Sequence, residues 1–437
     1  MMLFRAAIML VLLCSTLVSA SEHKTAELPS PLTDADFKPF DVEKARLGQL
    51  LFYDRVLSGE FIVSCASCHN HDRGSSNGVR LDLRHVDGGF NEEQGIYALN
   101  PNIRHAPTLF NLGAREFTTL FSDGRISGSR ETGFNAPSSL ESPDGLDDIV
   151  ALQALMPAVT REELAGSGSD LSPMAHGGNQ SVWDALAARV RDLPDYWPHV
   201  QKAYPEMQSL QQLTIVDIAN AIGAFVRAEW RSTNSPFDRA MAGDFSGFSD
   251  EARAGAKLFY GEAGCSGCHS GPLLTDHAFH AMGSWPWAHD ADLADEDLPV
   301  PLRGRSDMTG NQVDLFKLRT PSLRNVAATA PYGHAGGYKT LEAVIEQHID
   351  PASSLQKKLA EIESNGEPVP ESRKDIIADI ASAAESETPS PMRDWGATRR
   401  ENATRALIAF LETLTDEASL KGRLGKPAEV PSSLVID

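Results

Sequence analysis

The chain contains Cys65-Ala66-Ser67-Cys68-His69 and, 200 residues later, Cys265-Ser266-Gly267-Cys268-His269. Each stretch is a Cys-x-x-Cys-His run, the attachment motif of a c-type haem. The two thiols of such a run add to the haem vinyl groups, and the imidazole that follows binds the iron. The motifs therefore predict two covalently bound haem c groups. The expected attachment residues are Cys65, Cys68, Cys265 and Cys268, and the expected iron ligands are His69 and His269.

Two other interpretations use the same cysteines. Two Cys-x-x-Cys pairs can bind one zinc ion, and a single pair can be a redox dithiol. Neither chemistry requires a histidine directly after each pair, so the haem interpretation is favoured. The chain has five cysteines, and Cys14 is the one outside the motifs. It lies in the N-terminal apolar run, so no pair remains for a structural disulfide.

The N-terminus has the pattern of a secretory signal peptide, predicted to span residues 1–20. Arg5 precedes an apolar run over residues 6–18, and Val18-Ser19-Ala20 resembles a small-residue cleavage site. The run is too short for a transmembrane helix, and no other apolar stretch is long enough to span a bilayer. Export fits covalent haem attachment, which normally takes place outside the cytoplasm. We therefore expect a periplasmic protein with no membrane span.

Composition limits the class of partner. The 437 residues are 41% hydrophobic, which is enough for two or three domains with real cores. The formal net charge of −21 argues against nucleic acid and against anionic membranes. The negative charge favours a partner with a basic patch, or docking through a local surface patch whose charge differs from the net charge. A role in solubility alone explains the charge equally well.

The pattern around the motifs repeats. Residues 41–53 and 250–260 have helical periodicity, precede the two motifs, and share Gly-x-x-Leu-Phe-Tyr at Gly48 and Gly255. Asp41 is a plausible N-cap of the first helix. Closing helices are expected over residues 218–226 and 403–411, whose sequences also resemble each other. A repeated order of helix, motif, loops and helix indicates a duplicated unit.

We therefore expect a mainly α fold of two tandem class I cytochrome c-like domains, each enclosing one haem. The predicted boundaries are residues 36–240 and 241–425, with a charged insertion at about 352–400. Residues 285–312 hold many Asp, Pro and Gly and are expected to form a surface loop. The tail after Lys421 is expected to be extended.

Further motifs make the chain similar to the bacterial dihaem cytochrome c peroxidase family, including its methylamine-utilisation branch, MauG. The resemblance covers roughly residues 40–350. It rests on the order of the haem motifs together with five shorter segments: Arg104-His105-Ala106-Pro107-Thr108-Leu109-Phe110-Asn111, Phe121-Ser122-Asp123-Gly124-Arg125, Thr275-Asp276-His277-Ala278-Phe279-His280, Arg319-Thr320-Pro321-Ser322-Leu323-Arg324-Asn325-Val326 and Ala330-Pro331-Tyr332-Gly333-His334.

The resemblance implies unequal duties for the two haems. The first would bind hydrogen peroxide, and the second would be six-coordinate and relay electrons. The family's second distal ligand lies seven residues after the Leu of a Thr-Leu-Glu helix, where peroxidases have Met and MauG has Tyr. Here that position is His348, which would lower the potential relative to Met ligation. The alternative is that His348 is a surface residue of this helix, and that either Met282 or no residue is the sixth ligand of the second haem iron.

For the first haem, peroxidases carry a distal histidine sixteen residues after the proximal one, which blocks the iron until it is released. That position is His85, in a Gly-flanked segment suited to movement. The alternative is a solvated loop histidine, with His71 and His105 also nearby. His85 is thus a candidate iron ligand and a candidate catalytic residue.

The chain departs from the family at the peroxide side. The family's acid/base glutamate would fall at Arg130, so Glu131 is the candidate that protonates the leaving oxygen. A family glutamine is replaced by Leu120. The family also has a Trp between the two haems, which has no obvious counterpart in the first half of this chain. Tyr97 or Phe110 could take its place, or a Trp from another part of the chain could.

The resemblance also implies one calcium ion between the domains. Main-chain oxygens of Arg319 and Pro321 and the side chain of Asn91 would bind it together with waters. Arg324, His280 and His334 are expected to hold propionates or loops rather than to act in catalysis.

The leading hypothesis is a periplasmic peroxidase that takes electrons from a small cytochrome or cupredoxin, or oxidises a partner protein as MauG does. The departures at Leu120 and Arg130 favour the second version. The alternative from another class is a non-catalytic electron-transfer cytochrome with two bis-histidine haems, His85 and His348 being the extra ligands. The sequence leaves open whether the chain forms a homodimer, as family members often do.

Overall fold

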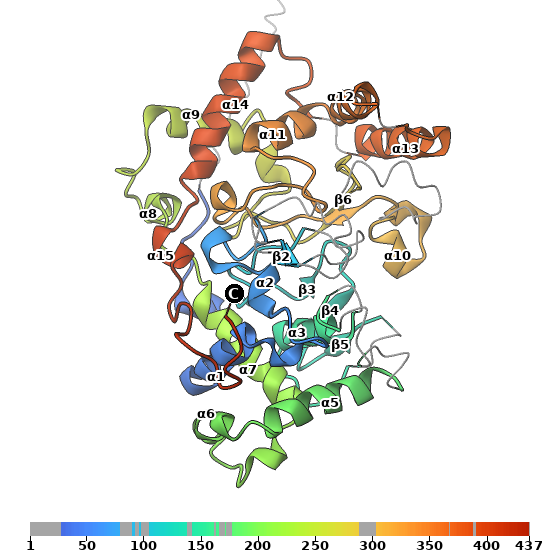
Figure 1. The fold of residues 1–437 in the computed structure, drawn as a ribbon. Helices are drawn as coiled ribbons and strands as arrows, with labels where there is room; N and C mark the ends of the chain where they lie inside the picture. Colours follow the sequence, from blue (N-terminus) through green and yellow to red (C-terminus); the bar gives the residue numbers. More distant parts are fainter. Residues whose placement is uncertain are drawn as a thin grey trace, which may run out of the picture.

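The computed structural model describes residues 28–78, 90–91, 96–97, 105–137, 142–160, 163–165, 171, 177–287, 303–366, 368–387 and 390–436. The described part is mainly helical, as predicted, and has three small antiparallel sheets (Figure 1). None of its helices is long and apolar enough to cross a membrane. The predicted signal peptide, residues 1–20, lies outside the described residues.

The α-helices are, in chain order, α1 (Val42–Tyr53), α2 (Cys65–Cys68), α3 (Ile149–Val159), α5 (Asn179–Arg191), α6 (Trp197–Ala203), α7 (Ile215–Glu229), α8 (Pro236–Met241), α9 (Asp250–Phe259), α10 (Ser306–Thr309), α11 (Leu341–Ile349), α12 (Pro351–Ser364), α13 (Glu371–Glu387), α14 (Ala397–Glu412) and α15 (Glu417–Leu420). The sheets pair β1 (Phe90–Asn91) with β2 (Ile96–Tyr97), β4 (Ile126–Ser129) with both β3 (Thr119–Leu120) and β5 (Gly133–Asn135), and β6 (Phe279–His280) with β7 (Leu318–Arg319).

Side-chain caps fix where the predicted helices begin. The Asp41 carboxylate accepts hydrogen bonds from the backbone N–H groups of Glu43 and Lys44, at 2.8 and 2.9 Å, so α1 starts where the sequence indicated. Ser249 caps α9 in the same way, through the Ala252 amide at 3.0 Å. The two expected closing helices are α7 and α14, both longer than predicted.

Two glycines let the helices of each half cross closely. A Cβ built on Gly48 of α1 would lie 1.9 Å from the Ala221 carbonyl oxygen of α7. A Cβ on Gly255 of α9 would lie 1.9 Å from the Ala406 carbonyl oxygen of α14. Separations this short are impossible for real atoms, so both crossings require glycine. The shared glycine of the repeated motif therefore marks the same helix contact in both halves.

Gly48→Ala should destabilise the protein by about 1–3 kcal/mol, because the added methyl pushes α1 away from α7. Denaturant unfolding of the protein measures this as a lower midpoint. Gly396→Ala is the matched control, since a Cβ there meets nothing within 4 Å and its φ of −63° suits alanine. Equal midpoints for the two variants would contradict the close crossing.

The apolar cores follow the same division. The first core joins α1, α3, α5 and α7, and a second joins α8, α9 and α14. The predicted insertion begins with α12 and α13, which bury a third core against Trp285 and Trp287. Both indoles are fully buried. The expectation that residues 285–312 form a surface loop is therefore wrong at its start, where the apolar side chains of the insertion cover the two tryptophans.

The C-terminal segment, residues 421–436, returns from the second half to the first (Figure 1, where C lies beside α1 and α7). Gln49 of α1 donates to the carbonyls of Leu424 and Gly425, at 3.1 and 2.8 Å. The buried Asp54 carboxylate accepts from the Ser432 hydroxyl at 2.6 Å. The predicted extended tail is thus an ordered part of the first half's surface.

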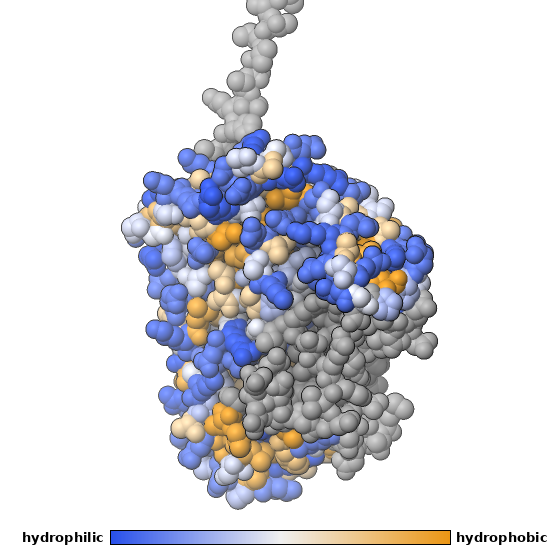
Figure 2. All heavy atoms as spheres, turned by 45° about the horizontal axis from the view of Figure 1, so that its top comes forward, coloured by the Kyte–Doolittle hydropathy of each residue, from blue (hydrophilic) through white to orange (hydrophobic). Residues whose placement is uncertain are grey.

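Figure 2 shows one face on which hydrophilic residues predominate and hydrophobic ones form small, separate patches. This agrees with the charge of −21 and with 23% charged residues.

Candidate functional site

The first motif is a single helical turn, α2, stabilised by hydrogen bonds at both of its ends. Ser64 N–H donates to the Ser67 hydroxyl at 2.8 Å, and the amide of His69 donates to the Cys65 carbonyl at 2.9 Å. The Nδ1 atom of His69 lies 3.0 Å from the Ser75 carbonyl oxygen. A carbonyl accepts only, so Nδ1 carries the proton and Nε2 keeps a free lone pair. Burial lowers the pKa of His69, which favours the neutral, metal-binding form.

The loop after His69 is held by the motif that resembles the family's Pro-Thr segment. Thr108 donates its hydroxyl proton to the Gly74 carbonyl at 3.1 Å, and the Leu109 amide donates to the Ser75 hydroxyl at 2.9 Å. Gly74 has a φ of +63° and packs on the Ala328 carbonyl of the second half. The carbonyl that orients His69 is therefore fixed from two sides.

The second motif repeats this geometry. The amide of His269 donates to the Cys265 carbonyl at 3.0 Å, and Nδ1 of His269 lies 3.1 Å from the Leu274 carbonyl oxygen. With the proton on Nδ1, Nε2 again carries the lone pair. A hydrogen bond from the remote ring nitrogen to a carbonyl fixes the tautomer of a metal-binding histidine and makes it more basic. Both histidines are thus prepared to bind a metal through the same atom.

His348 belongs to α11 (Leu341–Ile349), which packs in the same apolar core as Cys265 of the second motif. It is the next-to-last residue of α11, whose N-cap Thr340 accepts from the Ala343 amide at 3.2 Å. Its Nδ1 lies 2.7 Å from the Val344 carbonyl, one helical turn back, which leaves Nε2 free. The pKa of His269 is lowered to about 4, by burial first and then by the positive charge that His348 can carry. The two imidazoles are therefore electrostatic neighbours.

The cysteines and their surroundings fit two haem groups. All four motif cysteines are free of disulfides and partly exposed. Cys65 borders an apolar cavity lined by side chains of α3 and α7, among them Leu155, Ile218 and Ile222. A macrocycle needs apolar walls, two thiols and an oriented imidazole, and both motifs supply the thiols and the imidazole. A zinc site would need the two pairs together, whereas they belong to separate helical halves.

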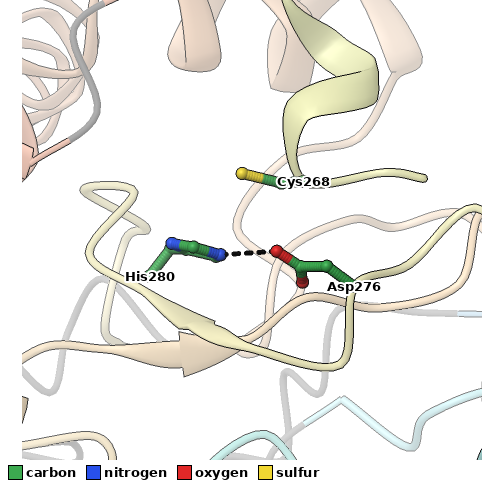
Figure 3. Close-up of side chains that lie close together, drawn as sticks. All are labelled: Cys268, Asp276 and His280. Carbon is green, nitrogen blue, oxygen red and sulfur yellow. Dashed lines mark hydrogen bonds and ion pairs between the residues drawn. The ribbon is translucent and has the colours of Figure 1, made fainter.

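Figure 3 shows Cys268 near the side chains of Asp276 and His280, whose Nε2 and Oδ2 atoms are 2.8 Å apart. One potential ligand atom from each residue lies within 4.8 Å of the others, the kind of grouping that could hold a metal ion. If Cys268 carries haem, its sulfur is a thioether, and the contact between His280 and Asp276 links two residues of one loop.

Arg324 is also structural. It is 1% exposed, its Nη1 lies 2.7 Å from Asp238 Oδ2, and its Nε donates to the Pro272 carbonyl at 2.7 Å. These bonds tie the loop after the second motif to α8. His334 Nδ1 lies 3.1 Å from the Ser284 hydroxyl. Both residues thus have loop contacts of the kind expected for them.

Of the proposed calcium residues, Arg319 lies where the two halves meet. The Arg319 backbone N–H donates to the Ser122 carbonyl at 2.7 Å, and the Arg319 Nε donates to the Phe121 carbonyl oxygen at 3.2 Å. Pro321 follows two residues later and is exposed. Asn91 belongs to β1, but its side chain lies outside the described residues. The position between the halves agrees with the expected one, while the ligand set stays a prediction.

The peroxide-side candidates are less defined. His85 lies outside the described residues. Glu131 lies between β4 and β5 and is fully exposed. It accepts a hydrogen bond from the Ser129 hydroxyl at 2.7 Å, and this bond is the main cause that lowers the pKa of Glu131. Arg130 is exposed beside Asp147, at 3.6 Å. Leu120 is buried in β3. The structure therefore does not bring Glu131 into contact with the first motif.

Sequence analysis missed a buried polar cluster behind the first motif, formed by Tyr53, His71 and Glu229. Tyr53 Oη lies 3.1 Å from His71 Nδ1, and Glu229 Oε1 lies 3.7 Å from the same nitrogen. Burial raises the pKa of Tyr53. Trp230 packs on His71 and on Phe52, with ring centroids 6.2 and 5.3 Å apart. The sequence analysis considered His71 only as a possible haem ligand. One difference between the two copies could have indicated the cluster: two residues after the motif, the first copy has His71 and the second has Gly271.

The chain is similar in sequence to known proteins that carry two haems. The sequence profile described as Di-haem cytochrome c peroxidase matches residues 42–246. The Methylamine utilization protein MauG of Methylophilus methylotrophus is 30% identical over 401 residues, which cover 87% of this chain and 96% of that protein. The chain belongs to the di-haem cytochrome c peroxidase family. It is accordingly an oxidoreductase of the peroxidase type with two haem cofactors.

Other members agree with this assignment. The Cytochrome c551 peroxidase of Nitrosomonas europaea is 27% identical, covering 70% of this chain and 73% of that protein. Among solved structures, a MauG-like protein associated with microbial copper homeostasis aligns with a TM-score of 0.58 and 26% identity, covering 91% of this chain and 95% of that one. The family's overall fold therefore extends through both halves of this chain.

Proposed function

We propose that this family member is a periplasmic enzyme that reduces hydrogen peroxide at the His69 haem and receives electrons through the His269 haem. The observation that carries the assignment is that a main-chain carbonyl holds Nδ1 of both His269 and His348, while the charge that His348 can carry lowers the pKa of His269. Two imidazoles suit a low-spin, electron-relaying iron. The other haem is then the one for peroxide, as the resemblance implies.

The chain's own residues orient the cofactors and handle protons. Each bound haem would supply an iron that takes up and delivers electrons. The carbonyls of Ser75 and Leu274 hold the axial imidazoles in one tautomer. We keep Glu131 as the proposed proton donor to the leaving oxygen and His85 as the proposed gate. Glu131 can serve only if the loop between β4 and β5 swings its exposed carboxylate toward bound peroxide.

Covalent attachment at both motifs is tested by haem staining of denatured protein. Wild type should carry two haems per chain, and Cys65→Ser/Cys68→Ser and Cys265→Ser/Cys268→Ser should each carry one. The reason is that each motif supplies its own pair of thiols. Retention of both haems after denaturation in either double variant would contradict the assignment. Recovery of the mature protein from the periplasm, cleaved after Ala20, would test the proposed export.

Peroxide turnover tests the function itself. After addition of one electron per protein, we expect a high-spin ferric signal from the first haem and steady consumption of peroxide with a reduced donor. If no reduced donor supports turnover after this activation, the peroxidase assignment fails. If neither haem binds cyanide or carbon monoxide, the protein is instead a bis-histidine electron carrier, with His85 and His348 as the additional ligands.

The physiological reductant is the finer question. The 30% identity to a MauG and the changes at Leu120 and Arg130 support oxidation of a partner protein over a small cytochrome or cupredoxin donor. A MauG-like enzyme should give a long-lived near-infrared absorption band on adding peroxide without prior reduction. Absence of the band, with turnover by a small reduced donor, would assign an ordinary peroxidase.

Three structural proposals accompany the function. The matching crossings at Gly48 and Gly255 support two tandem cytochrome c-like domains, residues 36–240 and 241–425. One calcium ion bound by Arg319, Pro321 and Asn91 would tie them together, so removal by a chelator should lower turnover and calcium should restore it. Sedimentation analysis would show whether the protein forms a homodimer.

A further inference from the structure

We infer that Asn111, Asn325 and Asp416 are positioning residues that fix the two haem-binding halves relative to each other and so set the rate of electron transfer between the haems. This inference rests on the proposed function, in which electrons pass from the second haem to the first. The rate of such a step depends on the distance and orientation of the two groups. A misplacement of ~1 Å, caused by a substitution far from the reacting groups, can cost about 10²-fold.

The two asparagines end equivalent segments of the two halves. These segments are Pro107-Thr108-Leu109-Phe110-Asn111 and Pro321-Ser322-Leu323-Arg324-Asn325, which share a proline, a hydroxyl residue, a leucine and the final asparagine. Both asparagines are buried and have a left-handed backbone, with φ of +60° and +59°. Asparagine adopts this conformation more readily than most residues, and unlike glycine it also brings a side-chain amide.

Each segment holds the loop that orients an axial histidine. The Thr108 hydroxyl donates to the Gly74 carbonyl at 3.1 Å. The Ser322 hydroxyl donates to the Leu273 carbonyl at 2.7 Å. Gly74 and Leu273 directly precede the residues whose carbonyls fix the tautomers of the two axial histidines. Each asparagine lies three positions after the hydroxyl residue, so its placement affects the loop behind a haem ligand.

Asn111 binds the chain that follows the closing helix of the first half. Trp230 comes directly after α7, and its carbonyl accepts from the Asn111 backbone N–H at 2.9 Å. The Asn111 side chain pairs with the backbone of Ser232 in both directions. Its Oδ1 accepts from the Ser232 N–H at 2.7 Å, and its Nδ2 donates to the Ser232 carbonyl at 3.0 Å. The start of the chain segment between the halves is thereby fixed.

Asn325 makes the equivalent contacts in the second half. Its backbone N–H donates to the carbonyl of Leu414, just after α14, at 3.1 Å. Its Oδ1 accepts from the Asp416 N–H at 2.7 Å, and its Nδ2 donates to the Ser419 hydroxyl at 2.9 Å. In both halves, the asparagine thus binds a carbonyl and the amide two residues later, directly after the closing helix.

Asp416 joins the two fixed segments to each other. It is buried, and its Oδ2 accepts from the backbone N–H groups of Thr233 and Asn234, each at 3.0 Å. Both amides belong to the segment between α7 and α8, so these bonds cross from one half to the other. The Ser232 hydroxyl also lies 3.5 Å from Asn325 Oδ1. Buried polar networks of this kind make a structure rigid and specify one arrangement.

The affected step is the transfer of one electron. The reductant of the proposed function first reduces the second haem. One electron then leaves that haem, which is oxidised, and enters the first haem, which peroxide has oxidised. No bond forms or breaks at the three positioning residues, because they act only through the placement of the halves.

Two measurements on the haem-loaded protein test the inference. Pulsed EPR of the oxidised protein gives the distribution of distances between the two irons. Rapid mixing of half-reduced protein with peroxide gives the rate at which the second haem is oxidised. In Asn111→Gly, Asn325→Gly and Asp416→Ala, we expect a broader distribution and at least tenfold slower oxidation, with the low-spin spectrum of the second haem kept. Glycine accepts the left-handed backbone, so the two glycine variants remove the amide without adding strain.

Ser433→Gly is the matched control, because Ser433 has a φ of +59° but is exposed. It should leave the distance distribution and the rate unchanged. Asp416→Asn is a milder variant, which keeps the shape of the side chain and one carbonyl oxygen. It should slow the oxidation less than Asp416→Ala, and it carries the test if the alanine variant does not fold.

The outcomes separate the two claims. Oxidation of the second haem as fast in the variants as in wild type would overturn the inference and leave the proposed function standing. A lower unfolding midpoint with an unchanged rate would overturn it equally, since the residues would then only stabilise the fold. If peroxide oxidises neither haem of the wild type, both the proposed function and the inference fail.

Discussion

Replacing His348 with alanine should convert the second haem from low-spin to high-spin and lower peroxide turnover more than tenfold. The Val344 carbonyl holds Nδ1 of His348 at 2.7 Å, which leaves Nε2 as the atom that would bind the iron, and the charge that His348 can carry lowers the pKa of His269. Loss of an outer partner of a metal ligand alone costs about 10–100-fold, and loss of the ligand should cost no less. Optical and EPR spectra of the oxidised protein measure the spin state.

Glu346→Ala is the matched control for this variant, because it removes an exposed side chain from the same helix. It should leave both spectrum and turnover unchanged. His348→Met should retain a low-spin haem and raise its potential, since thioether ligation favours the reduced iron. An unchanged low-spin spectrum in His348→Ala would show that another residue, such as Met282, is the ligand.

Replacing Glu229 with alanine should destabilise the protein by about 3 kcal/mol or more. Three amides of the C-terminal segment donate to this fully buried carboxylate, and each buried donor left without a partner costs about 1–3 kcal/mol. Denaturant unfolding of the haem-loaded protein measures the loss. Residues 421–436 should also become accessible to proteases.

Glu262→Ala is the control for the second variant. Glu262 pairs with Arg399 at 2.8 Å, but both side chains are about half exposed, so the loss should stay within about 1 kcal/mol. If the two glutamate variants unfold at the same denaturant concentration, the buried carboxylate is not what anchors the segment.

Local signals in the sequence predicted much of this molecule. Asp41 marks the start of α1, the repeated glycine marks the helix crossings, and each haem motif is contiguous. Such features depend on neighbours a few residues apart. His348 was proposed through its position in a motif, and its role as an iron ligand stays a prediction.

Contacts over long separations could not be predicted in this way. Glu229 meets the Arg423 amide 194 residues later, and irregular backbone such as residues 421–436 has no periodicity to signal its place. The burial of Trp285 depends on helices that begin more than sixty residues further along the chain. The peroxide side was the least predictable part, because Glu131 was inferred from a motif that this chain does not keep.

The anchoring of residues 421–436 on the first half also constrains the order in which the chain is completed. The first half is synthesised before residues 421–436, yet its Glu229 and His71 form backbone hydrogen bonds with that segment, and Asp54 accepts the Ser432 amide from it. Until then, a buried acid and a buried imidazole lack those partners, so the first half reaches its final form late. A chain shortened at its C-terminus should therefore fail first at the His69 haem, the one farther away in sequence.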